Sequence, residues 1–107
     1  MNAKETELNR IIDTVVSCCV TSEDGRTSLT RSDILGKCRS ENAVMTRCIL
    51  VTQIIGAGYT IATVALMLHR SVQAVRHLRH LAADFRVTSR AYRIAEDEVI
   101  QQLSQFV

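Results

Sequence analysis

Hydrophobic residues recur at three- and four-residue steps along most of this chain. Between residues 4 and 20 these steps are filled by Leu8, Ile11, Ile12, Val15, Val16 and Cys19. Such spacing puts one apolar stripe on a helix. The polar residues 21–28 predict a loop. Helical spacing returns further along, and no clear alternation with a period of two competes with it. The pattern therefore predicts an all-α fold of five to six helices.

Residues suited to helix N-caps precede four of the later segments. They are Thr30 for 31–35, Ser40 for 41–55, Thr60 for 61–68 and Ser71 for 72–85. Asp33 follows Thr30 at the spacing of a capping box. Gly36 ends the short helix, and Gly56-Ala57-Gly58 ends the long one, because glycine accepts the left-handed conformation of a C-cap. A last helix is predicted over about 89–105.

The segment 59–85 predicts a helix-turn-helix. Its first helix is almost wholly apolar, and the residues His69-Arg70-Ser71 join it to the second. The inner stripe of the second helix is Val72, Val75, Leu78, Ala82 and Phe85, and its other side carries Gln73, Arg76, His77 and His80. A helix that must be buried, followed by one that offers Arg and His to solvent, is typical of the motif whose second helix enters the DNA major groove.

The charge is unevenly distributed. The whole chain has a formal charge of only +2, but residues 69–93 hold six arginines against Asp84, a local charge of +5. Phosphate attraction depends on local charge, so this segment is able to bind a polyanion. The alternative is that it is simply the solvated face of a helix.

Composition limits the other classes of function. At 107 residues the chain predicts a single domain over 1–107. Its four cysteines lack metal-ligand spacing, and with no secretory signal pattern they suit a reduced, cytoplasmic and nucleoid-associated setting. His77 and His80 lack a third ligand nearby, so no metal and no cofactor are expected. Without a nucleophile motif or phosphate loop, an enzyme is not expected either, and residues 96–98 are interpreted as a solvated helix end.

One further alternative is a membrane span. Residues 48–68 carry no charged side chain and are about long enough to cross a bilayer. Gln53, the glycines and threonines of 56–63 and the amphipathic neighbouring helices argue against it, so no membrane is expected.

From Leu29 onward the order of features is similar to the C-terminal DNA-binding domain of the bacterial replication initiator family DnaA. Arg39-Ser40 matches the end of the family's basic loop, and Thr46-Arg47-Cys48-Ile49 partly matches the helix that follows. The family's Arg-Asp-His-Thr-Thr-Val-x-His signature aligns with residues 70–77. Arg70, Val75 and His77 agree with it, whereas its centre is Ser-Val-Gln-Ala here. The resemblance implies a Trp-repressor-like fold that binds duplex DNA, in replication or transcription regulation.

The chain departs from that family in two ways. Val72 and Ala74 stand where the family has side chains that hydrogen-bond to DNA, so a protein-interaction module on the same fold stays an alternative. No Gly-x-x-x-x-Gly-Lys-Ser/Thr loop is present, so no ATPase activity is implied.

On the DNA-binding interpretation, the helix that starts at Ser71 lies in the major groove. Ser71 meets a phosphate, Gln73 pairs with adenine, and Arg76 or His77 reaches a guanine edge or a phosphate. His80 lies on the same side. The candidates for backbone contacts are Lys37, Arg39, Arg47, Arg70, Arg79, Arg86 and Arg90. One base contact gives about 1–3 kcal/mol, short of the roughly 4–10 kcal/mol of a specific site. A homodimer through the N-terminal helix, or a protein partner, is therefore expected.

Overall fold

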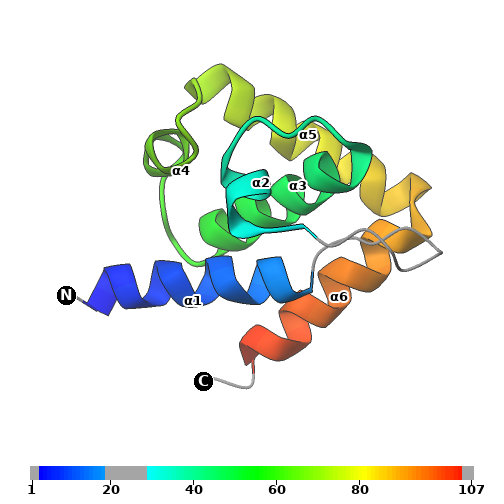
Figure 1. Cartoon of the computed structure of the whole chain (residues 1–107), viewed down its shortest axis with the longest axis horizontal. Coiled ribbons are helices and arrows are strands. Elements are labelled where there is room, and N and C mark those ends of the chain that lie inside the picture. The colour runs from blue at the N-terminus through cyan, green and yellow to red at the C-terminus, as the bar shows by residue number, and fades with distance from the viewer. Residues whose placement is uncertain (1–2, 19–28, 105–107) are drawn as a thin grey trace.

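Six helices and the turns between them make up residues 3–18 and 29–104, the part of the chain that the computed structural model describes, with side chains from Thr6 onward (Figure 1). They are α1 (Ala3–Ser17), α2 (Arg31–Leu35), α3 (Glu41–Gly56), α4 (Ile61–Leu68), α5 (Val72–Thr88) and α6 (Arg90–Ser104). No strand occurs in these ranges, so the all-α prediction is confirmed. The predictions for residues 19–28 and 105–107 lie outside the described residues.

Four helices begin at the caps predicted from the sequence. The side-chain oxygens of Thr30, Ser40, Thr60 and Ser71 each accept a hydrogen bond from the backbone N–H three residues later. The carboxylate of Asp33 also accepts from the N–H of Thr30 at 3.0 Å, which completes a capping box. At their other ends, α3 runs one residue further than predicted, to Gly56, and α5 runs to Thr88 instead of Phe85.

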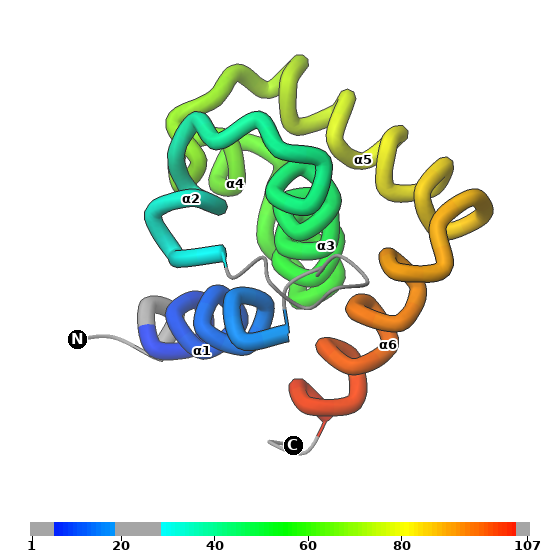
Figure 2. Tube along the Cα trace, turned by 45° about the vertical axis from the view of Figure 1, so that its right-hand side comes forward, coloured from blue at the N-terminus to red at the C-terminus, as the bar shows by residue number. Residues whose placement is uncertain are grey.

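The central element is α3, which contacts all five other helices. Figure 2 shows it nearly end-on, with α1 below, α5 above and α6 at the side. Its buried residues occur all round the helix, as expected for an element enclosed by its neighbours. A continuous hydrophobic cluster extends from it and includes Val15 of α1, Val64 of α4, Val75 of α5 and Tyr92 of α6.

The uncharged stretch 48–68 is not one helix. It is divided between α3 and α4 by a turn at residues 57–60, in which Gly58 has a φ of 104°. None of the described helices combines the length and the apolar character that a bilayer crossing needs. The spanning helix considered as an alternative is therefore absent.

The helices α4 and α5 are joined by the turn 69–71, in the segment for which the sequence predicts a helix-turn-helix. His69 closes α4 with a φ of 54°, in the left-handed region. Its N–H bonds to the carbonyl of Leu66 at 3.2 Å, and the N–H of Arg70 bonds to that of Ala65 at 2.9 Å. These two bonds are the Schellman pattern of a helix C-terminus. They turn the chain sharply and set the direction in which α5 leaves.

Candidate nucleic-acid interface

The outward face of α5 is polar and basic. Its opposite face buries Val75, Leu78 and Ala82 against the core, where α3 and α4 pack. Because the helix repeats every 3.6 residues, the remaining positions point to solvent. The exposed residues of its first three turns are Gln73, Arg76, His77, Arg79 and His80. The structure therefore brings together on one helix the base-contact candidates and part of the predicted backbone set.

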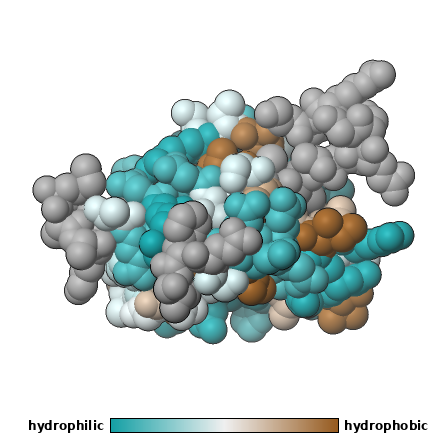
Figure 3. All heavy atoms as spheres, turned by 90° about the horizontal axis from the view of Figure 1, so that it is seen from below, coloured by the Kyte–Doolittle hydropathy of each residue, from teal (hydrophilic) through white to brown (hydrophobic). Residues whose placement is uncertain are grey.

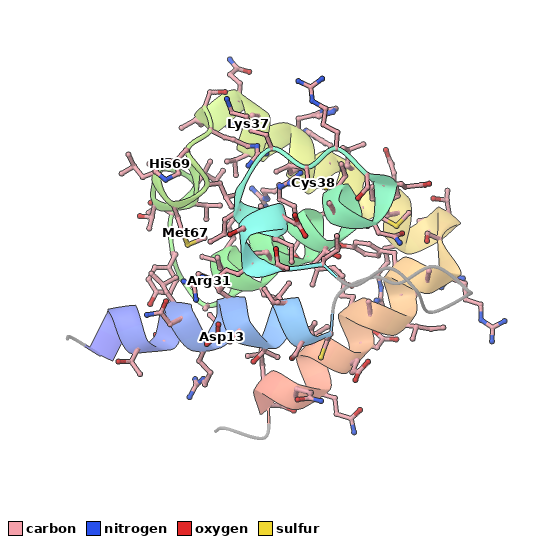
Figure 4. All side chains as sticks on the ribbon, in the orientation of Figure 1. Asp13, Arg31, Lys37, Cys38, Met67 and His69 are labelled. Atoms are coloured by element: carbon pink, nitrogen blue, oxygen red, sulfur yellow. The ribbon has the colours of Figure 1, made fainter. Side chains whose placement is uncertain are left out.

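Several of the predicted arginines have no acidic partner among the side chains that the structure describes. Within the described ranges, ion pairs join Arg31 to Asp13 and Arg86 to Glu96 and Asp97. The Arg31–Asp13 pair bridges α2 and α1, on the side of α3 away from α5 (Figure 4). Arg76 and Arg79 take part in none of these pairs and are exposed. Their charge is therefore available to an anionic partner.

Arg86 is different, because its charge is compensated. Its Nη1 lies 2.7 Å from Glu96 Oε1 and 2.9 Å from Asp97 Oδ1. The hydrogen bond to Asp97 raises the pKa of Arg86 above its ordinary value, and the charge of Glu96 adds to this. Glu96 also accepts from the Tyr92 hydroxyl at 2.8 Å. The prediction that residues 96–98 are merely a solvated helix end is wrong for Glu96 and Asp97, because the chain reverses between α5 and α6 and brings them to Arg86.

Arg47 does not belong to the candidate interface, because it is buried in the fold. The residue is only 4% exposed. The guanidinium donates to four carbonyl oxygens of residues 33–38, those of Asp33, Ile34, Gly36 and Cys38, at 2.8–3.3 Å. Burial lowers its pKa, and nearby Arg70 adds to that effect. The expected contact with a DNA backbone is wrong for Arg47, since its side chain is buried and its Nε and Nη2 donate to carbonyls inside the protein.

Arg70 ties the turn of the helix-turn-helix to the loop after α2. Its Nη2 donates to the carbonyl of Gly36 at 2.8 Å, and its Nη1 donates to that of Leu68 at 3.3 Å. Gly36 is required there, because a Cβ would lie 2.5 Å from the carbonyl oxygen of Ser32. Arg70 is half-buried and acts as a positioning residue. It holds the loop beside the start of α5.

That loop carries the remaining basic candidates near the turn. Lys37 and Arg39 are both exposed. Figure 4 shows Lys37 and Cys38 on the upper side of the molecule, the side on which the α4–α5 turn with His69 also lies. A hollow of about 200 Å³ between loop and turn is lined by residues 35–37 and 68–70. Arg90, in contrast, begins α6, roughly 25 Å from Ser71 along α5, and is not part of this group.

Ser71 lies at the exposed N-terminus of α5. Its Oγ accepts from the N–H of Ala74 at 3.1 Å. The first N–H groups of any helix lack partners within it, and the helix dipole makes this end positive. The predicted position of Ser71, beside a phosphate, is therefore sterically open.

The structure adds two hollows beside α5 that the sequence did not predict. The first, of about 340 Å³, is lined by Ile61, Arg76, Arg79, His80 and Ala83. The second, of about 510 Å³, is lined by Thr52, Gln53, Arg79, Ala82, Ala83, Arg86 and Glu96. Their lining comes from four helices, so only the fold brings these residues together.

The described residues contain no group of three or more His, Cys, Asp or Glu side chains arranged to hold a metal ion. Comparison with models of protein families, with curated proteins and with solved structures finds no match to this chain. The resemblance to the initiator domain therefore stays a prediction from the residues.

Proposed function

We propose that this protein binds duplex DNA through α4 and α5, with α5 in the major groove. The observation that carries the proposal is the outward face of α5. Gln73, Arg76 and His77 are exposed there, next to a turn held by Arg70. A first helix that packs on the core, here through Val64, Ala65 and Leu68, followed by a second helix with an exposed basic face, is the arrangement that reads DNA in helix-turn-helix proteins.

Each exposed group then has a specific role. The amide of Gln73 is able to bond adenine in bidentate fashion, and Arg76 or His77 reaches a guanine edge or a phosphate. Ser71 and the N-terminus of α5 bind a phosphate. Arg39 and Lys37 contribute further contacts to the backbone near the turn, and the protein acts as a regulator of replication or transcription without an ATPase part.

A second copy or a protein partner is needed for sequence specificity, because one base contact discriminates too little. Ile11, Ile12 and Val15 of α1 are buried in their own protomer. The apolar stripe of the N-terminal helix is therefore not available to a partner. The face seen from below, over α1 and α6, is mostly hydrophilic (Figure 3). A dimer through α1 would have to use its polar outer side.

Binding of a random-sequence duplex at several salt concentrations tests the proposal. The double variant Arg76→Ala/Arg79→Ala lacks two arginines expected to bind phosphates. It should reduce the slope of log affinity against log salt concentration by about 2, since each phosphate contact contributes about 0.9. Arg10→Ala/Arg31→Ala removes the same formal charge from the α1–α2 side and is the control for net charge, with its stability checked by urea unfolding because Arg31 pairs with Asp13. An equal loss in both variants, or no binding by the unaltered protein, contradicts the proposal.

A protein-interaction module on the same fold is the second candidate. Val72 and Ala74 favour it, because neither side chain is able to hydrogen-bond to DNA at the start of α5. The exposed side chains of Leu66 and Val87 are single apolar residues of a kind that is normal on a protein surface. On this alternative, binding to random duplex is absent, or does not weaken as salt is raised.

A further inference from the structure

The two hollows beside α5 form one groove. They share Arg79 and Ala83 in their lining, so they lie next to each other along the flank of α5. At one end lies Ile61, the first residue of α4, and at the other lies Glu96 of α6. We call this surface the flank groove. From Arg76 to Arg86 it follows α5 for about 15 Å.

The flank groove is cationic. Arg79 lies where the hollows join, with Arg76 and His80 on one side and Arg86 on the other. The acidic residue among the lining, Glu96, is already bonded to Arg86 and to Tyr92. Arg76 and Arg79 belong to none of the ion pairs in the described ranges. A guanidinium offers a planar fork of donors that matches phosphate oxygens.

The lining favours a duplex backbone over a protein partner or a single strand. Ala82 and Ala83 leave no deep apolar pocket of the kind that anchors a protein partner. The residues that line the two hollows include no Phe, Tyr or Trp, and His80 is the one aromatic ring among them. Proteins that bind single strands generally stack the bases on aromatic side chains. The phosphates of a duplex backbone need neither a deep apolar pocket nor a stacking surface.

The position of the flank groove agrees with such a ligand. In a helix-turn-helix the first helix crosses the DNA backbone while the second lies in the major groove. The groove begins at Ile61, where α4 starts, and continues beside α5. On the far flank of α5, Leu81 and Phe85 are half-buried apolar residues. The cations are therefore on one flank only.

We propose that the flank groove holds the phosphate backbone of a single strand of duplex DNA, so that α5 contacts the backbone on one side. This inference rests on the proposed function and adds to it the strand contact that fixes how α5 is seated. Arg79 is the central phosphate-binding residue, and Arg86 marks the end of the strand contact, where its charge is compensated by Glu96 and Asp97.

Ala83 provides the test, because it is exposed, lies on a helix and lines both hollows. Ala83→Glu puts a carboxylate in the groove, and Ala83→Gln puts an uncharged side chain of the same shape there. Both residues are good helix formers, so the fold is expected to be kept. The probe is a random-sequence duplex of 20 base pairs, with binding followed by fluorescence anisotropy at two salt concentrations.

Ala83→Glu is expected to weaken binding roughly tenfold at low salt, while Ala83→Gln stays within about threefold of the unaltered protein. Ala91→Glu on exposed α6 adds the same charge outside the groove and is expected to resemble Ala83→Gln. If Ala83→Glu binds as tightly as Ala83→Gln does while the unaltered protein binds the duplex, the flank groove is wrong and the proposed function stands. If the unaltered protein does not bind duplex, both are wrong.

Discussion

At the scale of single residues, Arg47 shows how a cation is accommodated without a carboxylate. Its guanidinium spreads its donors over carbonyl oxygens at the end of α2 and in the following loop. This fastens a five-residue helix, too short to be stable alone, to the centre of the fold. Through Gly36, which accepts from both Arg47 and Arg70, the same network reaches the turn before α5.

Replacing Arg47 is therefore expected to destabilise the whole protein. In Arg47→Ala the carbonyls of Asp33, Ile34 and Cys38 lose this donor, and only that of Gly36 keeps another, from Arg70. The free energy of unfolding should therefore fall by about 3 kcal/mol. Arg47→Lys should restore only part of this, because one ammonium cannot reproduce the planar fork. Urea unfolding measures both, with exposed Arg39→Ala as the control, expected within about 0.5 kcal/mol. A tolerated Arg47→Ala would show that these bonds contribute little.

Whereas Arg47 stabilises the fold, the backbone conformation of His69 lowers its stability. It adopts a φ of 54°, which costs a residue with a Cβ roughly 1–2 kcal/mol. Glycine avoids this cost but loses more entropy on folding. His69→Gly is expected to raise the free energy of unfolding by up to about 1 kcal/mol, whereas Ala83→Gly inside α5 should lower it by about 1 kcal/mol. Thermal or urea unfolding compares the two, and a destabilised His69→Gly would indicate that the His69 side chain has a structural role.

At the scale of elements, helix starts were predictable because their cause is local. A Ser or Thr hydroxyl bonds an N–H three residues later, and both groups are visible in the sequence. Helix ends were less predictable, since α5 continues to Thr88 within the packing against α6. The prediction for Arg47 was wrong because its charge suggested an exposed position. Its spacing, four residues after Ala43 and seven before Ile54, both buried, places it on the inner side of α3.

The cap of α5 separates stability from DNA binding. Ser71→Ala removes the cap and should cost about 1 kcal/mol of unfolding free energy. Ser71→Asp keeps a cap and complements the helix dipole, so stability should be retained. If a phosphate lies at this end of α5, the new carboxylate repels it, and Ser71→Asp should bind duplex more weakly than Ser71→Ala. Unfolding and anisotropy titrations on the same samples measure this, and equal or tighter binding by Ser71→Asp contradicts the placement of the phosphate.

At the scale of the whole molecule, the predictable part of the candidate interface is the part that lies on one helix. The periodicity of α5 alone put Gln73, Arg76 and His77 on its outer side. The flank groove needed the fold, because Gln53 and Ile61 reach α5 only once α3 and α4 pack on it. The compensation of Arg86 likewise depends on the reversal into α6. The position of the stripe of α1 also depends on packing, since α3 and α6 cover it.

Two weakly acidic side chains, Tyr92 of α6 and Cys48 of α3, are buried where these two helices pack together. Tyr92 is fully buried, its ring lies 5.8 Å from that of Phe85, and its hydroxyl donates to Glu96. Burial raises the pKa of Tyr92 far above its ordinary value, and the bond to Glu96 adds to this. Burial also raises the pKa of the Cys48 thiol to about 12. Both groups are neutral when protonated, which suits an apolar interior.

The protein is therefore expected to lose stability at alkaline pH. In the unfolded chain a thiol ionises near pH 8.5 and a phenol near pH 10 (both approximate). Since the folded pKa values are higher, the stability that these groups contribute is complete below the pKa of the unfolded chain and falls as the pH rises from there toward the folded pKa. Each group changes the free energy of unfolding by up to about 1.4 kcal/mol per pH unit in this range.

Urea unfolding between pH 8 and 11 should show a steep decline in the free energy of unfolding, and Tyr92→Phe and Cys48→Ala should each make that decline shallower. Tyr59→Phe is the matched control, because Tyr59 is only half-buried and its removal should change the slope less. An equal slope in Tyr92→Phe and the unaltered protein would mean that the Tyr92 hydroxyl ionises without unfolding, and that α6 does not enclose it as the packing indicates.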